Sequence, residues 1–160
     1  MDLTRFVTAQ DGGGTYDAAL RELRAGRKTS HWMWFVFPQV AGLGRSSTAR
    51  HYALAGLDEA AAYLAHPVLG PRLQACCRAL LEQQNADAAA LLGSADAQKL
   101  HLSMTLFALN TSDEPLFAEV LDRFYNGEQD PLTLARAGRA TPAVGPLGQP
   151  APAATRPAAR

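Results

Sequence analysis

The chain has 160 residues, a formal net charge of zero and an apolar content of 48%. This length and composition are typical of one globular domain that folds without disulfides or metals. They argue against a membrane-spanning helix, because no apolar run approaches the roughly 20 residues that such a helix needs. The N-terminus, MDLTRF, also lacks the layout of a signal peptide, so we expect a cytoplasmic protein.

Two short amphipathic helices are predicted in the first 26 residues. Asp2 can cap the first helix, and the glycines at 12–14 end it. Thr15 can cap the second helix, and Gly26 stops it. The inward-facing residues of the two helices are Leu3, Phe6, Val7 and Gln10, followed by Tyr16, Ala19, Leu20 and Leu23.

The segment HWMWFVF at residues 31–37 has no usable periodicity. By composition it could be a buried strand or a buried helical turn, and Pro38 closes it in either case. We expect Trp32, together with Phe35 or Phe37, to anchor the core. Trp34 falls on a different helical face and could stay exposed to stack on a ligand ring.

Three helices are predicted in the middle of the chain. Ser46 or Ser47 can cap the first, which runs through Tyr52, and a second covers residues 57–64. Pro71 suits the first turn of the third. Its buried face has the spacing i, i+3, i+4, i+7, i+8 and consists of Leu73, Cys76, Cys77, Leu80 and Leu81. The two cysteines are therefore interpreted as core residues, not as a disulfide or a metal site.

The C-terminal half continues as helices. Asp87 can cap a short turn that ends at Gly93. Residues 94–110 alternate partly like a strand but also fit a wide helical face, and their length favours a helix. Asp113 can cap a further helix with Pro115 in its first turn, and residues 130–135 suggest one more helical turn.

Residues 138–160 contain five prolines, three glycines and seven alanines, with no acidic or aromatic residue. Such a segment cannot bury enough apolar surface to offset the entropy of ordering, so we expect a disordered tail. The sequence shows no internal repeat and no alternation of strands with helices. It therefore predicts an all-α fold, with a single compact multi-helix domain at residues 1–137.

The sequence also resembles the domain-of-unknown-function family 1810, from about Leu3 to Leu134. The resemblance rests on GRKTSHWMWFVFPQVAGLGRSSTARHYAL, EAAAYLAHPVLGPRL, KLHLSMTLF and FAEVLDRFYNGEQD. It implies a mostly α-helical single domain, and so a helical reading of both ambiguous segments. It implies no established activity. The name calpastatin, sometimes given to members, finds no support, because the chain lacks a calpastatin-like inhibitory repeat.

Positive charge is concentrated in one window of the chain. Residues 23–57 contain no Asp or Glu and carry +5, whereas the rest of residues 1–137 carries −8. One cationic face on an acidic domain is expected, and it predicts binding of something anionic. The candidate ligand-binding residues in this window are Arg27, Lys28, Ser30, Trp34, Gln39, Arg45 and Ser46.

The segment GLGRSS at residues 42–47 could hold a phosphate or carboxylate, because glycines and hydroxyls precede a predicted helix start. It matches neither of the familiar glycine-rich phosphate motifs, and a tight turn with a helix cap is the favoured explanation. The nearby cations could also be neutralised, with Glu22, Asp58 or Glu59 as the candidate partners.

His31 is the weak catalytic candidate, because it alone in this window could move a proton near neutral pH. A buried histidine bonded to the backbone is the favoured alternative. Neither the histidines nor the cysteines show metal-ligand spacing, so we expect no metal site, and the cofactor is left open. The main interpretation is a small anionic ligand, phosphorylated or nucleotide-like. The alternatives are a protein-interaction module and an ADP-ribose-like N-glycosidase; nucleic acid is disfavoured, and the oligomeric state is left open.

Overall fold

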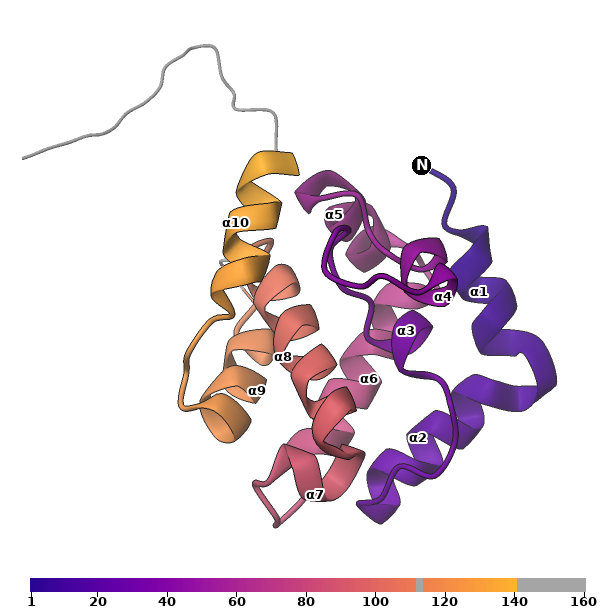
Figure 1. Ribbon diagram of the computed structural model, residues 1–160. Helices are drawn as coiled ribbons and strands as arrows, with labels where there is room; N and C mark the ends of the chain where they lie inside the picture. The colour runs from indigo at the N-terminus through magenta and orange to yellow at the C-terminus, as the bar shows by residue number, and fades with distance from the viewer. Residues whose placement is uncertain (112–113, 141–160) are drawn as a thin grey trace, which may run out of the picture.

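The computed structural model describes residues 1–111 and 114–140, which form an all-α fold (Figure 1). Within them, an isolated bridge between Val40 and Leu54 is the sole β pairing. The predicted fold class is thus confirmed. The elements in chain order are α1 (Thr4–Asp11), the 3₁₀ helix η1 (Gly12–Gly14), α2 (Thr15–Ala25), α3 (Met33–Val36), α4 (Ser47–His51), α5 (Leu57–Ala65), α6 (Leu69–Leu81), α7 (Ala88–Leu92), α8 (Ser94–Ala108), α9 (Leu116–Tyr125) and α10 (Pro131–Ala140).

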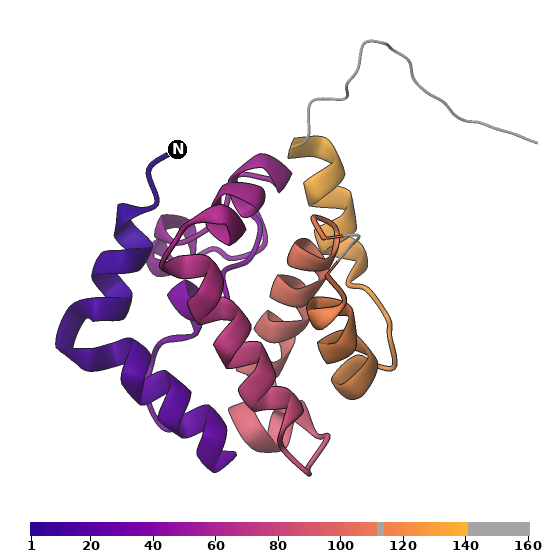
Figure 2. The ribbon, with the colours of Figure 1, turned by 180° about the vertical axis from the view of Figure 1, so that it is seen from behind.

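The helices α6 and α8 run through the middle of the domain (Figures 1 and 2). On one side α1 and α2 form an outer layer, with α2 packed against α6. On the other side α9 packs against both α6 and α8, and α10 packs against α8. The short helices α3 and α4 and the chain that joins them lie beside α1 and face α8 (Figure 1). This connection and the face of α8 opposite it form the candidate site.

Aromatic rings fill the centre of the core. Trp32, Phe6, Tyr63 and Phe107 are all fully buried, and Phe6 meets Tyr63 edge-on with ring centroids 5.2 Å apart. Phe37 is also buried, so Trp32 and Phe37 anchor the core as predicted, whereas the ring of Phe35 is half-buried. Rings of this size bury the largest apolar area per residue, which explains why the segment at residues 31–37 lies at the centre.

The two cysteines are core residues, as their spacing predicts. Cys76 and Cys77 are fully buried and free of any disulfide, and the Cys77 sulfur lies 3.6 Å from that of Met104. Burial raises the pKa of the Cys76 thiol to about 12 and that of Cys77 well above its ordinary value. Burial thus favours the neutral form of both thiols near neutral pH, which is the less reactive form.

Several predicted helix ends are confirmed because they depend on local chemistry. Gly26 adopts φ +77 after α2, Ser46 accepts the backbone N–H of Ala49 at 3.1 Å, and Asp87 caps α7. Thr15 is different, since it is the first residue of α2 and its hydroxyl donates to the Gly12 carbonyl at 2.6 Å. The predicted cap at Asp113 lies outside the described residues.

The last helix is longer than its sequence suggested. Where we expected one turn, α10 spans ten residues, from Pro131 to Ala140. Its start is fixed by Asp130, whose carboxylate accepts the N–H of Thr133 at 2.8 Å and its hydroxyl at 2.9 Å. The helix continues past residue 137, where we placed the end of the domain. The predicted tail beyond Ala140 falls outside the described residues.

Truncation of the two tryptophans should have unequal effects on stability. Trp32 has 0% exposure, so Trp32→Ala is expected to lower the free energy of unfolding by about 3–5 kcal/mol. Trp34 is half-buried, and Trp34→Ala should cost much less. Denaturant unfolding of both variants beside the wild type measures the difference. Equal losses would place both rings in the core and leave no aromatic ring available to a ligand.

Candidate functional site

A single carboxylate shapes the chain that leads into the site. After α2 ends at Gly26, the chain turns back along the last turn of that helix, and Glu22 binds it there. The Glu22 carboxylate accepts the N–H groups of Thr29 at 2.8 Å and Ser30 at 3.0 Å, the Ser30 hydroxyl at 2.5 Å and the Trp32 indole N–H at 2.9 Å. Four donors on one carboxylate hold residues 29–32 in a fixed path.

The pKa of Glu22 reflects these bonds. Burial by itself would raise the pKa, but the hydrogen bonds from the Ser30 hydroxyl, the Thr29 N–H, the Trp32 indole and the Ser30 N–H outweigh burial and lower the pKa to about 2. Hydrogen bonds that donate to the charged form of a carboxyl favour that form. Glu22 is therefore ionised under all ordinary conditions, and it is used within the fold and not as a partner for the arginines.

Lys28 is also committed to the fold. Its ammonium group lies 2.7 Å from the Asp96 carboxylate, donates to the Ser30 carbonyl at 2.6 Å and sits 5.0 Å from the centre of the Trp32 ring. Its side chain is only 8% exposed. The partner of this lysine is thus Asp96, and not one of the three acids that the sequence suggested.

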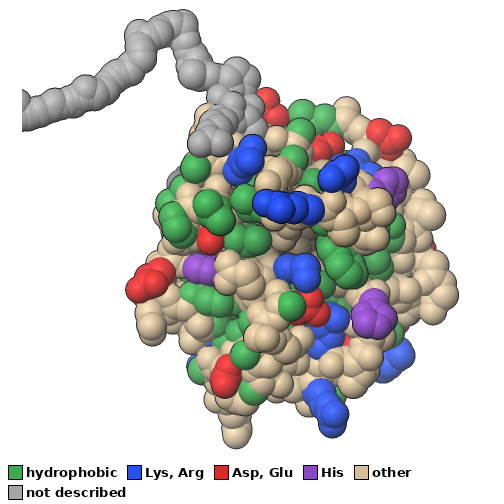
Figure 3. All heavy atoms as spheres, viewed as in Figure 1, with side chains coloured by type: hydrophobic (Ala, Val, Ile, Leu, Met, Phe, Trp, Pro, Cys, Tyr) green, Lys and Arg blue, Asp and Glu red, His purple; other side chains and the backbone are tan. Residues whose placement is uncertain are grey.

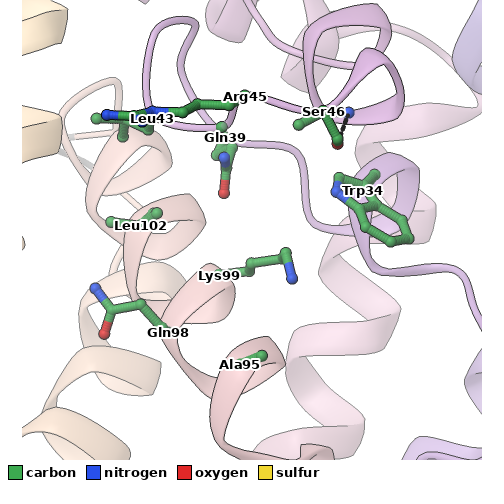
Figure 4. A pocket seen from close by; sticks show the side chains of 11 residues that line it. Trp34, Gln39, Leu43, Arg45, Ser46, Ala95, Gln98, Lys99 and Leu102 are labelled. Atoms are coloured by element: carbon green, nitrogen blue, oxygen red, sulfur yellow. Dashed lines mark hydrogen bonds between the residues drawn. The ribbon is translucent and has the colours of Figure 1, made fainter.

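A pocket of about 390 Å³ lies between the α3 to α4 connection and one face of α8 (Figure 4). Trp34, at the second position of α3, forms one wall, and the loop before α4 forms another. The helix α8 supplies the third wall. The lining residues are Trp34, Gln39, Leu43, Gly44, Arg45, Ser46 and Ala49 from the first half of the chain, and Ala95, Gln98, Lys99 and Leu102 from α8.

The pocket is cationic. Its lining contains Arg45 and Lys99 and no Asp or Glu. Arg45 is exposed, whereas Lys99 is half-buried and its ammonium lies 5.1 Å from the centre of the Trp34 ring and 3.3 Å from Asp96. Asp96 also contacts Lys28, so one acid is shared by two lysines and leaves a positive charge uncompensated. Several Lys and Arg side chains lie on this face of the molecule (Figure 3).

Gln39 gives the pocket a buried amide. The residue is only 8% exposed, and no described residue donates a hydrogen bond to its Oε1, which is shielded from solvent. Its backbone is fixed, because the Gln39 carbonyl accepts the N–H of Leu54 at 2.9 Å and Ala41 donates to the Leu54 carbonyl at 2.7 Å. Buried polar atoms without a partner are rare in folded proteins, so this oxygen is a candidate for ligand contact.

Ser46 plays a smaller part than expected. Its hydroxyl oxygen already accepts the N–H of Ala49, and α4 is only five residues long. A helix start that is capped by its own serine offers few free N–H groups to an anion. Of the two explanations for the GLGRSS segment, the turn with a helix cap describes the backbone, while Arg45 and Ser46 still line the pocket.

The structure brings together Trp34, Gln39, Arg45 and Ser46 but not the other candidates. Arg27 is exposed, and the Ser30 hydroxyl donates to Glu22, so neither belongs to the pocket lining. His31 is exposed, and its interpretation as a buried histidine is wrong, because the turn held by Glu22 directs Trp32 inward instead.

Sequence reasoning missed the α8 side of the pocket. Lys99 and Gln98 belong to a helix more than 50 residues away from Arg45 in the chain, and no local motif links the two segments. Among the described residues, no helix combines the length and apolar character needed to cross a bilayer. The same residues contain no group of three His, Cys, Asp or Glu side chains placed to hold a metal ion.

The chain is similar to known proteins both in sequence and in fold. Residues 1–137 match the family described as "Protein of unknown function (DUF1810)". A similar solved structure is the crystal structure of the conserved hypothetical protein Rv1873 from Mycobacterium tuberculosis. It is 46% identical, the match covers 84% of this chain and 94% of that chain, and the TM-score is 0.80. No curated protein matches the chain. The predicted resemblance is confirmed, and no activity accompanies it.

The hydrogen bonds to Glu22 make a specific contribution to the pH dependence of stability. Its pKa in the folded protein, about 2, lies below the ordinary value of 4.5. The stabilisation is therefore complete above about pH 4.5 and is lost as the pH falls toward 2. We expect Glu22→Gln to be less stable than the wild type at pH 7, and this difference to shrink across that interval.

Chemical denaturation of both proteins from pH 7 to pH 2 measures the difference. Glu82→Gln, which changes an exposed carboxylate at the end of α6, is the matched control and should track the wild type. If the difference in free energy of unfolding between Glu22→Gln and the wild type stays constant with pH, Glu22 stabilises the fold through its packing and not through its charge.

Proposed function

The chain belongs to the family described as protein of unknown function (DUF1810), and we propose that it binds a small anionic ligand, phosphorylated or nucleotide-like, in the pocket between α8 and residues 39–46. The observation that carries the proposal is the lining itself. It combines two cationic side chains, a tryptophan and a buried amide, and it contains no acid. Small-molecule sites commonly pair apolar walls with a few convergent polar groups in this way.

Charge and shape favour an anion that enters the pocket. Arg45 presents a guanidinium that can bind phosphate or carboxylate oxygens in a bidentate manner, and Lys99 adds a point charge from the opposite wall. The pocket volume of about 390 Å³ lies within the range of roughly 300–1,000 Å³ that is typical of small-molecule sites. In Figure 4 the Arg45 guanidinium lies beside Leu43 and the Lys99 ammonium points toward Trp34, so an anion that contacts both would draw the two side chains toward itself.

Trp34 limits the ways in which a ring could bind. The Lys99 ammonium lies 5.1 Å from the centre of the indole, which is the range of a cation–π contact. A phosphate that draws Lys99 toward itself would uncover this side of the indole, and a ring joined to that phosphate could then stack on it. A nucleotide-like ligand would then contact Lys99 through its phosphate and the indole of Trp34 through its ring.

The other two functions fit the geometry less well. A protein-interaction module would use exposed cations such as Arg27, but it gives no role to a concave pocket with a buried amide. An N-glycosidase of the ADP-ribose type would need a carboxylate at the scissile bond. The pocket lining contains none, and nearby Asp96 is paired with two lysines.

The test is a thermal-shift screen of phosphorylated metabolites and nucleotides at low ionic strength. A ligand at 100 times its Kd stabilises the protein by about 2.7 kcal/mol, which visibly raises Tm. We expect selective hits that are lost in Arg45→Ala and strongly weakened in Lys99→Gln. Arg27→Ala, which removes an exposed cation outside the pocket, is the matched control and should bind as the wild type does.

Two outcomes would contradict the proposal. If only polyanions such as heparin or nucleic acid raise Tm, with steep salt dependence and equal losses in Arg27→Ala and Arg45→Ala, the surface attracts anions in general. If no compound raises Tm at concentrations up to the millimolar range, the pocket does not hold an anion of this class.

A further inference from the structure

Gln39 is the least expected group in the pocket wall. It is more than nine-tenths buried, yet its Oε1 accepts no hydrogen bond from the described residues. Leaving a buried acceptor unpaired destabilises a protein relative to pairing it, so an apolar side chain of similar size would stabilise the unliganded protein better. The presence of an amide at this position is therefore best explained by a bound ligand that donates a hydrogen bond to its oxygen.

The orientation of the amide indicates what that partner must be. Figure 4 shows the oxygen of Gln39 directed toward the space enclosed by Leu102, Lys99 and Trp34, with the nitrogen on the other side. The nitrogen lies against Gly44, where an added Cβ would come within 3.2 Å of it. The terminal torsion of a glutamine is soft, so a small rotation suffices to present the oxygen to a ligand.

We infer that Gln39 determines the specificity of the pocket by selecting anions that carry an O–H or N–H donor beside their negative charge. The inference rests on the proposed function and deepens it. Arg45 and Lys99 attract any small anion, whereas the Gln39 oxygen accepts a hydrogen bond only from a protonated group. The ligand class is thus a hydrogenphosphate, or a phosphate ester with a neighbouring hydroxyl or amino group, and not an anion without donors.

A matched pair of ligands tests this directly. At pH 8 inorganic phosphate and sulfate both carry about two negative charges and have similar size, but only phosphate retains an O–H. Titration calorimetry or thermal shift should show that the wild type binds phosphate about tenfold more tightly than sulfate, a difference of about 1.4 kcal/mol. Glycerol 3-phosphate and propyl phosphate form a second pair, which differs in hydroxyl groups, and should show the same order.

The variant Gln39→Met removes the acceptor and keeps the approximate length of the side chain. It should bind phosphate and sulfate with equal affinity, and its Tm without ligand should be higher than that of the wild type. Gln84→Met is the matched control, because Gln84 is an exposed amide outside the pocket lining. It should keep the preference for phosphate and leave Tm unchanged.

The possible failures separate the two proposals. If the wild type binds all four compounds but does not distinguish within either pair, or if Gln39→Met keeps the preference, the role of Gln39 is refuted and anion binding stands. If none of the four compounds binds to the wild type while the metabolite screen is also negative, the proposed function and this inference fall together. A Tm for Gln39→Met below that of the wild type would show that the amide serves the fold.

Discussion

The path of residues 29–32 depends on the Glu22 carboxylate, and the core and the pocket depend on that path. Because the carboxylate accepts the indole N–H of Trp32, the largest side chain of the core can be buried without leaving its polar atom unpaired. Once Trp32 faces inward, α3 begins at the next residue, and Trp34 falls on its other side toward α8. The hydrogen bond to Glu22 thus explains why Trp32 is a core residue while Trp34 lines the pocket.

Asp96 connects the turn at residues 29–32 to the pocket lining through two ion pairs. It pairs with Lys28, which lies under the turn, and with Lys99, which lies in the pocket lining. The two lysines share one carboxylate. The Lys28 ammonium lies 2.7 Å from Asp96 and the Lys99 ammonium 3.3 Å, so the charge of Lys28 is compensated more closely than that of Lys99. The remaining positive charge is therefore directed to the pocket side, where Arg45 adds to it. This arrangement leaves net positive charge in the pocket lining without leaving the buried Lys28 unpaired.

The features that sequence could predict are those decided within a few residues. Gly26, Ser46 and Asp87 end or begin helices by contacts with near neighbours, and the spacing of Cys76 and Cys77 alone identifies them as buried. The charge of residues 23–57 pointed to a window that supplies part of the pocket lining, but it could not distinguish the cations within that window. Lys28 and Arg45 look alike in sequence, and only the position of Asp96, 68 residues beyond Lys28, makes the first structural. Lys99 could not be foreseen for the same reason.

The loop before α4 packs tightly against that helix at Gly44. A Cβ at Gly44 would lie 2.5 Å from the Cβ of Ala49, so no larger residue fits without moving the loop away from α4. The same loop is joined to the chain after α4 through the bridge between Val40 and Leu54. The backbone at Gln39 is consequently fixed next to the pocket, because its carbonyl also accepts the N–H of Leu54. If the proposed ligand binds, little ordering of this wall would remain to be done, because its backbone is already fixed and only the soft terminal torsion of the amide would have to adjust.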